Sequence, residues 1–533
     1  MTWNPLTPSI SETAKIRYFV VPFTRGIGAD LGCGPERIWP KALGIDRTLS
    51  PHGAALARDI ANLAFFADDS LDYIYSSHAL EDFPASRTEA ILAEWWRVIK
   101  PGGHLVLYLP HEDHYPRVGQ PGCNPAHRRN FNEQDTLNLM RRLTSEGGSG
   151  AVVALNEVRS AGNEYSFLQV FRKTRHPGWA AAPSLSGKKR ALVIRYGGYG
   201  DILQASSVFP GLKNQGYEVW VNTTGRGRDI LAHDPHIDGW WLQDPEQVPN
   251  ACLGDYWRAL EQRFDRVINL SESVEGTLLT LPHRVNDRWP DRARHLFFNH
   301  NQMTVIHAIA GVPPGSNLRF HPSDKERRQA QRMRRGLGRG PVILWVLAGS
   351  SLHKAWPFVD HVLAALLLEK PTLHFILVGD EFCRVLEEGW RNERRVHRRS
   401  GRWDIRKTLS FAQCADVVVG PETGVMNALG LEEVGKVLFL SHSSVENISS
   451  HWQRTVNLKP PAEVTCHPCH RLHYDWERCH RDPETGAAWC SAAIRPDRVT
   501  AAILFLLGEL HEQKRGHRTD STPNRTGSCA GLG

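Results

Sequence analysis

The sequence is poor in cysteine, has no long apolar run and carries nearly balanced charge. Ten cysteines among 533 residues are too few for a disulfide framework, so we expect a reducing, cytoplasmic environment. The longest apolar stretches, such as 501–507, fall far short of the roughly 18 residues that a membrane-spanning helix needs. The first 15 residues contain neither a basic region nor an apolar core, so we also expect no secretory signal.

Basic residues outnumber acidic ones by 64 to 57, which does not by itself indicate a nucleic-acid partner. The excess is concentrated in two arginine clusters, made of Arg327, Arg328, Arg332, Arg334, Arg335 and Arg339, and of Arg391, Arg394, Arg395, Arg398 and Arg399. Such clusters are typical of solvated helix faces, and they would also suit peripheral contact with an anionic inner-membrane surface. The first block has no aromatic-interleaved basic patch and no motif that accommodates a flipped base, so we expect no nucleic acid.

A chain of 533 residues corresponds to about three or four domains. Strand-like runs alternate with helix-length amphipathic segments, the pattern of α/β domains with parallel sheets. Three such blocks predict three Rossmann-like domains. The expected parts are a leader at 1–14, a first domain at 15–175, a linker rich in Pro, Ala, Gly and Ser at 176–188, a second domain at 189–325, a third at 326–510 and a disordered tail at 511–533.

Apolar runs bounded by turn residues give the expected elements. In the first block we predict a helix over 86–99 that ends at the Lys-Pro-Gly-Gly segment 100–103, because proline cannot continue a helix. The predicted strands are 27–31, 43–46, 71–75 and 104–109 in the first block, 190–195 and 218–222 in the second, and 341–347 in the third.

A glycine-rich segment follows the first predicted strand. Residues 28–34 read GADLGCG, in which two glycines are spaced for a tight turn from strand to helix. Glycine lets the backbone approach a ligand where a Cβ would clash. Asp46 ends the next strand, where it can accept hydrogen bonds from ribose hydroxyls. The segments FFADDSLDYIYSSHALED and WWRVIKPGGHLVLYLP follow.

Together these segments resemble the class I S-adenosylmethionine-dependent methyltransferases over about residues 15–175. The resemblance implies that Asp30, Gly32 and Gly34 cradle the methionine part of the cofactor. It also implies that Asp46 binds the ribose and that Asp59 faces the adenine. The spacing from Gly34 to Asp46 is shorter than is usual in the family, which indicates a trimmed first helix.

Methyl transfer is an in-line displacement, so the protein mainly supplies positioning and removal of the acceptor proton. Four side chains flank the strand ends where a general base would lie, namely His78, Glu81, His111 and His114. The alternative for each histidine is an ordinary surface or structural role, because the chain contains 26 of them.

The second block opens with ALVIRYGGYGD, a strand that runs into a glycine-rich turn and a helix beginning at Asp201. The third block contains LAGSSLHKAWP at 347–357, FILVGDE at 375–381 and CADVVVGPETGVMNALG at 414–430. In this order the motifs resemble glycosyltransferase family 9, the ADP-heptose:lipopolysaccharide heptosyltransferase type, over about 189–510. The resemblance implies a two-domain GT-B fold, a nucleotide-sugar donor, and inversion of the anomeric centre without a metal.

Asp201 matches the family's base, which takes the proton from the acceptor hydroxyl. An aspartate that only caps the helix would look the same in the sequence.

The third block is expected to hold the donor. Lys354 and the backbone N–H groups of Thr423 and Gly424 would stabilise the leaving nucleoside diphosphate. Glu381 and Glu422 would contact ribose or sugar hydroxyls.

Two departures from the family pattern leave two hypotheses open. The family usually reads Asp-Thr-Gly-x-x-His, whereas this chain has Glu422 at the first position and Asn427 at the last. Loss of the imidazole removes a phosphate contact, so ADP-heptose is only the family default. One hypothesis is a two-activity enzyme that modifies a surface-glycan or lipopolysaccharide-type acceptor. The other is that one block is a catalytically degenerate nucleotide- or glycan-binding module.

Four cysteines gather near the end of the chain with the spacing C-x2-C-x9-C-x10-C, namely Cys466, Cys469, Cys479 and Cys490. Four thiolates that include a C-x2-C pair can hold a tetrahedral zinc ion. The second half of the cluster lacks such a pair, so a metal-free cluster is the alternative. The rival ligands are His467, His470, His473 and His480.

Overall fold

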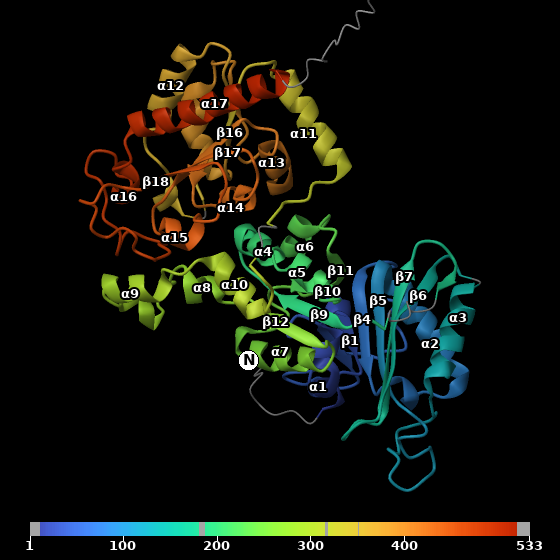
Figure 1. Ribbon diagram of the computed structural model, residues 1–533. Helices are drawn as coiled ribbons and strands as arrows, with labels where there is room; N and C mark the ends of the chain where they lie inside the picture. Colours follow the sequence, from blue (N-terminus) through green and yellow to red (C-terminus); the bar gives the residue numbers. More distant parts are fainter. Residues whose placement is uncertain (1–10, 146, 181–186, 315–317, 350, 520–533) are drawn as a thin grey trace, which may run out of the picture. The chain divides into compact units, whose positions relative to one another are not determined.

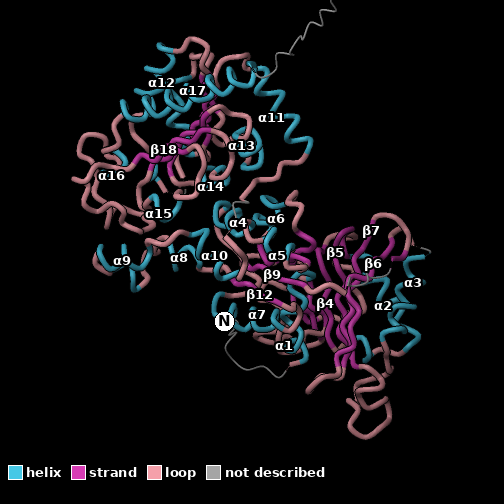
Figure 2. The backbone as a smooth tube through the Cα atoms, viewed as in Figure 1, coloured by secondary structure: helices cyan, strands magenta, loops and turns pink. Residues whose placement is uncertain are grey.

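A computed structural model describes residues 11–145, 147–180, 187–314, 318–349 and 351–519 (Figure 1). It confirms the α/β class, with three separate sheets (Figure 2). The chain forms two compact units, the first made of 1–192, 220–225 and 239–267, and the second of 193–219, 226–238 and 268–533.

This division differs from the domain boundary expected at 189, because part of the second block packs within the first unit. The Asp244 carboxylate accepts hydrogen bonds from Arg25 Nε at 2.9 Å and from the Gly26 N–H at 2.8 Å. The Gln247 amide donates to the carbonyls of Val21 and Thr24, at 2.9 and 3.0 Å. These polar contacts, of which those of Gln247 are buried, attach the segment 239–267 to the first block.

The first sheet has eight strands in the order β3-β2-β1-β4-β5-β7-β6-β8. Strands β1 to β5 pair in parallel, and β7 is antiparallel to both β5 and β6. The bounds are β1 Gly28–Leu31, β2 Leu43–Asp46, β3 Leu56–Ala57, β4 Leu71–Ser77, β5 Ile99–Pro110, β6 Gly150–Arg159, β7 Ser166–Thr174 and β8 Trp179–Ala180. All four strands predicted in this block are present.

Two sequence predictions in this block need correction. The helix α2 (Ala85–Val98) ends as expected, but the Lys-Pro-Gly-Gly segment lies within β5 rather than in a separate turn. A register shift between Leu71 and Tyr73 of β4 accommodates the extra residues. The predicted linker 176–188 contains β8, which pairs in parallel with β6, and its residues 181–186 lie outside the described part of the chain.

Helix α2 covers the first sheet with an apolar face. Ile91, Leu92, Trp95 and Trp96 are buried in the core cluster of this sheet, and the Trp95 indole donates to the Ile60 carbonyl at 2.7 Å. The other helices of the first block are α1 (Glu12–Ile16), the 3-10 helix η1 (Arg17–Phe23), η2 (Leu80–Asp82) and α3 (Glu133–Ser145).

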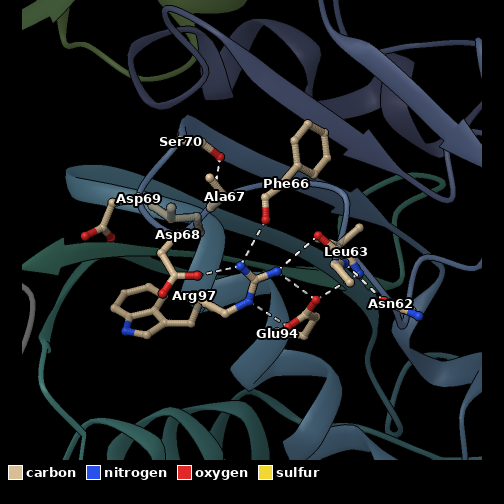
Figure 3. A network of polar contacts seen from close by, with 12 residues as sticks. Asn62, Leu63, Phe66, Ala67, Asp68, Asp69, Ser70, Glu94 and Arg97 are labelled. Carbon is tan, nitrogen blue, oxygen red and sulfur yellow. Dashed lines mark hydrogen bonds and ion pairs between the residues drawn. The ribbon is translucent and has the colours of Figure 1, made fainter.

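Arg97, in the last turn of α2, anchors the loop between β3 and β4 (Figure 3). Its guanidinium donates to the carbonyls of Leu63 and Phe66, both at 3.0 Å, and pairs with Glu94 and Asp68. One side chain therefore satisfies two loop carbonyls and two carboxylates. The loop that carries Asp59 is held in place by this network.

The second sheet has four strands in the order β11-β10-β9-β12. Their bounds are β9 Arg190–Ile194, β10 Glu218–Thr223, β11 Ile237–Leu242 and β12 Arg266–Asn269. The helices of this region are α4 Tyr199–Ser206, α5 Phe209–Asn214, α6 Gly225–Leu231, α7 Leu253–Glu261, α8 Ser273–Thr277, α9 Asp291–Phe298 and α10 Gln302–Ala310, with the 3-10 helices η3 Asn250–Cys252 and η4 Val285–Arg288.

The third sheet is parallel throughout, in the order β15-β14-β13-β16-β17-β18. Its central strands are buried along their whole length, which explains their continuous runs of apolar residues. The bounds are β13 Val342–Val346, β14 His374–Val378, β15 Val396–Arg398, β16 Val417–Pro421, β17 Gly435–Phe439 and β18 Thr455–Leu458. The helices are α11 Asp324–Gly336, α12 Val359–Glu369, α13 Ile405–Ala412, α14 Gly424–Leu429, α15 Val445–Ile448, α16 Trp489–Ala492 and α17 Pro496–Thr519, with η5 Leu352–Lys354 and η6 Phe382–Trp390.

The last helix corrects the expected tail. Helix α17 buries Ile503, Leu506 and Leu507 in the core of the third sheet and continues to Thr519, beyond the predicted start of disorder at 511. Residues 520–533 lie outside the described residues. Within the described segments, none of the helices combines the length and apolarity needed to cross a bilayer.

Candidate functional site

The glycine loop after β1 is tied to the end of β2. The Gly34 N–H donates to Asp46 Oδ2 at 2.8 Å, and Asp46 Oδ1 accepts the Arg47 N–H. Gly32 has φ +72°, and a Cβ built there would lie 2.4 Å from the Ala79 side chain. Only glycine fits this position, so the structure gives a physical reason for the motif.

Gly32→Ala is expected to destabilise the first unit by roughly 2 kcal/mol or more, because it combines a left-handed backbone with a steric clash. Gly34→Ala is the matched control. Its φ is +56°, but a Cβ there meets nothing within 4 Å, so the expected cost is only about 1 kcal/mol. Urea unfolding of the two variants measures the difference. Equal losses of unfolding free energy in the two variants would show that the clash with Ala79 contributes nothing to the cost at Gly32.

Asp30 is buried at the carboxyl end of β1, where burial raises the pKa of its carboxyl to about 8. Its Oδ2 accepts the Ile38 N–H at 2.6 Å, while Oδ1 has no hydrogen-bond partner in the described structure. A buried oxygen without a partner is costly unless a ligand satisfies it. Asp30, Asp46 and the glycine loop therefore fit a ligand that carries an ammonium group and a ribose.

A cavity of about 540 Å³ is lined by Arg47, the neighbour of Asp46, and by residues at or after the ends of β3 and β4, but by no residue of the glycine loop. Asp59 lies in its wall, 4.0 Å from Arg87 Nη2, together with Asp82 and Phe83. The volume suits a cofactor-sized molecule. Three further arginines line the cavity, namely Arg47, Arg58 and Arg128.

A buried acidic and imidazole cluster follows β4. Glu81 is fully buried, and neither of its carboxylate oxygens has a hydrogen-bond partner within the described residues. Its Oε1 lies 3.6 Å from both His78 Nδ1 and His127 Nε2. Burial raises the pKa of Glu81 to about 8 and lowers that of His78 to about 3. The cluster is thus poised to exchange a proton near neutral pH.

His78 has a left-handed backbone, with φ +49°, and its Nε2 lies 2.9 Å from Ser166 Oγ. Strain of this kind concentrates at functional sites. The Glu12 carboxylate, 3.7 Å away, joins the same cluster and accepts the Tyr165 hydroxyl at 2.7 Å. The sequence pointed to His78 and Glu81, whereas Glu12, His127 and Tyr165 come from distant segments and carry no motif signal.

The other two predicted base candidates are placed less favourably. His111 has both ring nitrogens engaged, because Nδ1 accepts the Asp113 N–H at 3.1 Å and Nε2 lies 2.9 Å from the Glu133 carboxylate. His114 is exposed and stacks on His111.

In the second unit, Asp201 lies in the first turn of α4. Its carboxylate accepts the Gly198 N–H at 3.1 Å and lies 3.5 Å from Arg195 Nη2. Asp201 therefore caps the helix, as the alternative of a merely capping aspartate predicts. It is also partly exposed, since 31% of its side chain is accessible. A cap that keeps an accessible oxygen can still accept a proton.

The helices α4 and α14 pack through glycine. A Cβ on Gly200 would lie 3.1 Å from the Gly424 Cα and 2.9 Å from Asn427 Nδ2. This approach brings the helix start at Asp201 against the helix start at Thr423, whose hydroxyl caps α14 by accepting the Met426 N–H. The sequence-predicted base and the predicted phosphate-binding residues are thus brought together.

Lys354 lies between these elements. Its Nζ donates to the Glu422 carbonyl at 2.8 Å. Burial lowers the pKa of Lys354, while the carboxylates of Glu422 and Asp201 oppose that shift. The lysine is therefore close enough to both carboxylates to sense their charge.

The predicted contacts of two glutamates need correction. Glu422 is buried, and its carboxylate accepts the N–H groups of Ser441 and Ser443 and lies 2.7 Å from His442 Nδ1. Burial alone would raise its pKa, but His442 and Lys354 hold it at about 2. Its carboxylate is buried against these groups, so it is not presented to a sugar hydroxyl. Glu381 is exposed and pairs with Arg384 at 3.0 Å, and no contact joins it to Lys354 among the described residues.

The four clustered cysteines line one cavity of about 200 Å³, which also reaches Lys354 and His442. Burial raises the thiol pKa to about 12 for Cys469 and about 11 for Cys479, so these thiols stay protonated unless a cation binds. Cys469 Sγ lies 3.5 Å from His473 Nε2. The four cysteines thus share one cavity with two of their histidine rivals, His473 and His480, but in the described structure no three of these ligand atoms all lie within 4.8 Å of one another, so they are not at metal-binding distance.

Comparison with curated proteins finds no significant match. Among solved structures, the chain is similar to ADP-heptose lps heptosyltransferase II of E. coli, with 14% identity and a TM-score of 0.42 over 60% of this chain and 99% of that one. It is similar to a glycosyl transferase family 9 protein of Veillonella parvula, with 13% identity and a TM-score of 0.45 over 60% and 97%. A SAM dependent methyltransferase of Archaeoglobus fulgidus gives 12% identity and a TM-score of 0.23 over 30% and 91%. A family model described as a methyltransferase domain matches residues 30–107, and the chain therefore contains a methyltransferase domain.

Proposed function

We propose that this protein is a bifunctional glycan-modifying enzyme, which combines S-adenosylmethionine-dependent methyl transfer with inverting glycosyl transfer from a nucleotide-sugar. The observation that carries the second activity is the convergence of Asp201 and Lys354 where α4 meets α14. The first activity rests on the methyltransferase domain and its glycine loop. The acceptor that we propose is a surface glycan or a lipopolysaccharide-type glycolipid.

For methyl transfer, the cofactor supplies an electrophilic methyl group on a sulfonium. Asp46 binds the ribose hydroxyls, Asp30 receives the ammonium group of the methionine part, and Asp59 faces the adenine across the 540 Å³ cavity. Glu81, relayed through His78, takes the proton of the acceptor hydroxyl or amine. Because Glu81 has its pKa raised to about 8, its ionised form is a strong enough base for this step.

For glycosyl transfer, Asp201 accepts the proton of the attacking hydroxyl as the bond to the anomeric carbon forms. The bond to the nucleoside diphosphate breaks in the same displacement, which inverts the anomeric centre. The Lys354 ammonium stabilises the charge that grows on the diphosphate. ADP-heptose is the donor that the sequence resemblance favours.

A second candidate function is a single activity with the other block serving as a binding module. The observation that favours it lies in the second unit, where Asn427 stands in place of the usual histidine and packs against Gly200. Nucleotide binding without transfer would distinguish this candidate from the bifunctional enzyme.

We extend the proposal to two further ligands. The four cysteines share one cavity and would bind zinc as thiolates only if the ion drew them closer, because no three of their sulfur atoms lie within 4.8 Å of one another in the described structure. Peripheral contact with an anionic membrane surface would use the arginines of α11 and its C-terminal turn that remain exposed, namely Arg327, Arg328, Arg332, Arg335 and Arg339.

Thermal unfolding with S-adenosylhomocysteine and with ADP, each alone, tests the two nucleotide sites. A ligand at about 100 times its dissociation constant stabilises the folded state by about 2.7 kcal/mol. We expect each ligand to raise the unfolding temperature of the unit that binds it. If only one ligand shifts a transition, the silent block is a scaffold or uses another nucleotide, and the bifunctional proposal reduces to a single activity.

A further inference from the structure

We propose that Asp234, His236 and His321 form a binding site for a zinc-class divalent metal ion in the second unit. The three residues are far from the cysteine cluster in the sequence, and neither proposed reaction uses them. Each offers one ligand atom, and these atoms all lie within 4.8 Å of one another. No other group of three His, Cys, Asp or Glu residues in the described chain meets this distance.

The geometry of the first two ligands is fixed by the backbone. Asp234 is buried, and its Oδ1 accepts the His236 N–H at 3.0 Å. The His236 Nδ1 lies 2.8 Å from the same oxygen, so the imidazole and the carboxylate already face each other. The His321 ring approaches from a separate segment, with its centroid 6.2 Å from that of His236. The set is therefore largely assembled before an ion arrives.

The chemistry of the set suits a transition-metal ion. Two imidazoles and one carboxylate are ligands that zinc accepts with a fourth position left for water. Both histidines are only partly buried, which leaves room for that water. The Asp234 carboxylate favours a cation at this site, whereas the charges of Arg319 and Arg327, which also act on His321, oppose it.

The location of the site indicates a structural role for the ion. Asp234 and His236 lie between α6 and β11, and His321 lies just before α11. Arg406 of α13 already joins the same segments, because it donates to the carbonyls of Ile230 and His321 and pairs with Glu326. A metal ion would add a second cross-link at this junction. We infer that it stabilises the connection through which the chain passes from the second sheet to the third.

Cobalt titration tests the proposal on the full chain, because Co²⁺ substitutes for zinc and reports its ligands by colour. Nitrogen and oxygen ligands give weak visible bands only, whereas thiolates add an intense charge-transfer band, so the cysteine site is read separately. We expect one equivalent of Co²⁺ to bind without that band. In His321→Gln and in His236→Gln its affinity should fall by more than the roughly 10- to 100-fold that loss of a merely orienting residue costs.

His233→Gln is the matched control, because His233 is exposed in the same segment and lies outside the three-residue group. It should bind Co²⁺ like the unaltered protein. Circular dichroism checks that the variants are folded. We expect them to be, because both His236 and His321 lie in loops. Failure to bind Co²⁺ outside the thiolate site, or binding that neither His236→Gln nor His321→Gln weakens, would overturn the proposal. Neither result bears on the nucleotide sites.

Discussion

Asp201→Asn should lower the rate of sugar transfer by about 10²- to 10⁴-fold, the range that loss of a positioned general base costs. The amide keeps the size of the side chain and can still accept the Gly198 N–H, so α4 should remain capped. It cannot take the proton of the attacking hydroxyl. The measurement is nucleotide release from ADP-heptose in the presence of a lipopolysaccharide core acceptor. Stabilisation by ADP should be retained, because the donor residues are untouched.

Asp229→Asn is the control for this variant, since Asp229 is an exposed aspartate of α6 and takes no part in the proposed site. It should transfer at the unaltered rate. Stabilisation by S-adenosylhomocysteine should also be unchanged in Asp201→Asn, because the cofactor residues all lie in the first unit. Sugar transfer that survives the Asp201 substitution within a few-fold would remove the proposed base and favour a cap alone.

Glu81→Gln should stabilise the first unit at pH 8 by on the order of a few kcal/mol and leave its stability nearly unchanged below pH 4.5. The folded pKa of Glu81 is about 8, above the ordinary value of 4.5. Between these values the folded state holds a proton that the unfolded state has lost. The stability contributed by protonated Glu81 is therefore complete below pH 4.5 and is lost as the pH rises through about 8. Glutamine stays neutral and lacks this loss.

Urea unfolding between pH 4 and 9 measures the effect. Glu89→Gln is the matched control, because Glu89 lies exposed on α2 and only pairs with Arg142 at 3.2 Å. It should change stability by less than about 1 kcal/mol at any pH. Asp30 contributes a similar loss of stability with rising pH in every variant, so the comparison rests on differences between variants.

Parallel pH profiles of stability for the unaltered protein and Glu81→Gln would show that Glu81 is ionised when folded. Methyl transfer by Glu81→Gln should fall, which separates the functional role from the structural one.

The strands and the glycine loop of the first block could be predicted because their signals are local. Gly32 and Gly34 must adopt left-handed backbone conformations within one short turn, and the sequence carries that requirement directly. Asp201 and Lys354 could be proposed because each lies in a contiguous motif, and their roles stay predictions. For these residues, spacing along the chain was a sufficient guide to position.

Other residues of the candidate site could not be predicted, because distant segments assemble them. His127 reaches Glu81 from a loop 46 positions away, a separation that no periodic pattern reports. The sequence predicts Glu422 as a sugar-binding carboxylate. In the structure its carboxylate is paired with His442, which follows β17. The attachment of 239–267 to the first unit depends on Asp244 and Gln247 finding backbone partners near residue 24, and neither residue lies in a motif.

Because the segment 239–267 belongs to the first unit, the chain cannot be divided cleanly at the linker. A gene fragment that ended in the linker would encode the methyltransferase domain but not the amide of Gln247 or the carboxylate of Asp244, which satisfy the chain at Val21, Thr24 and Gly26. The parts of the chain before and after the linker are therefore not independent folding units. Recombination in the linker would separate residues that fold as one body, and the first unit would lose the contacts that fix residues 21–26.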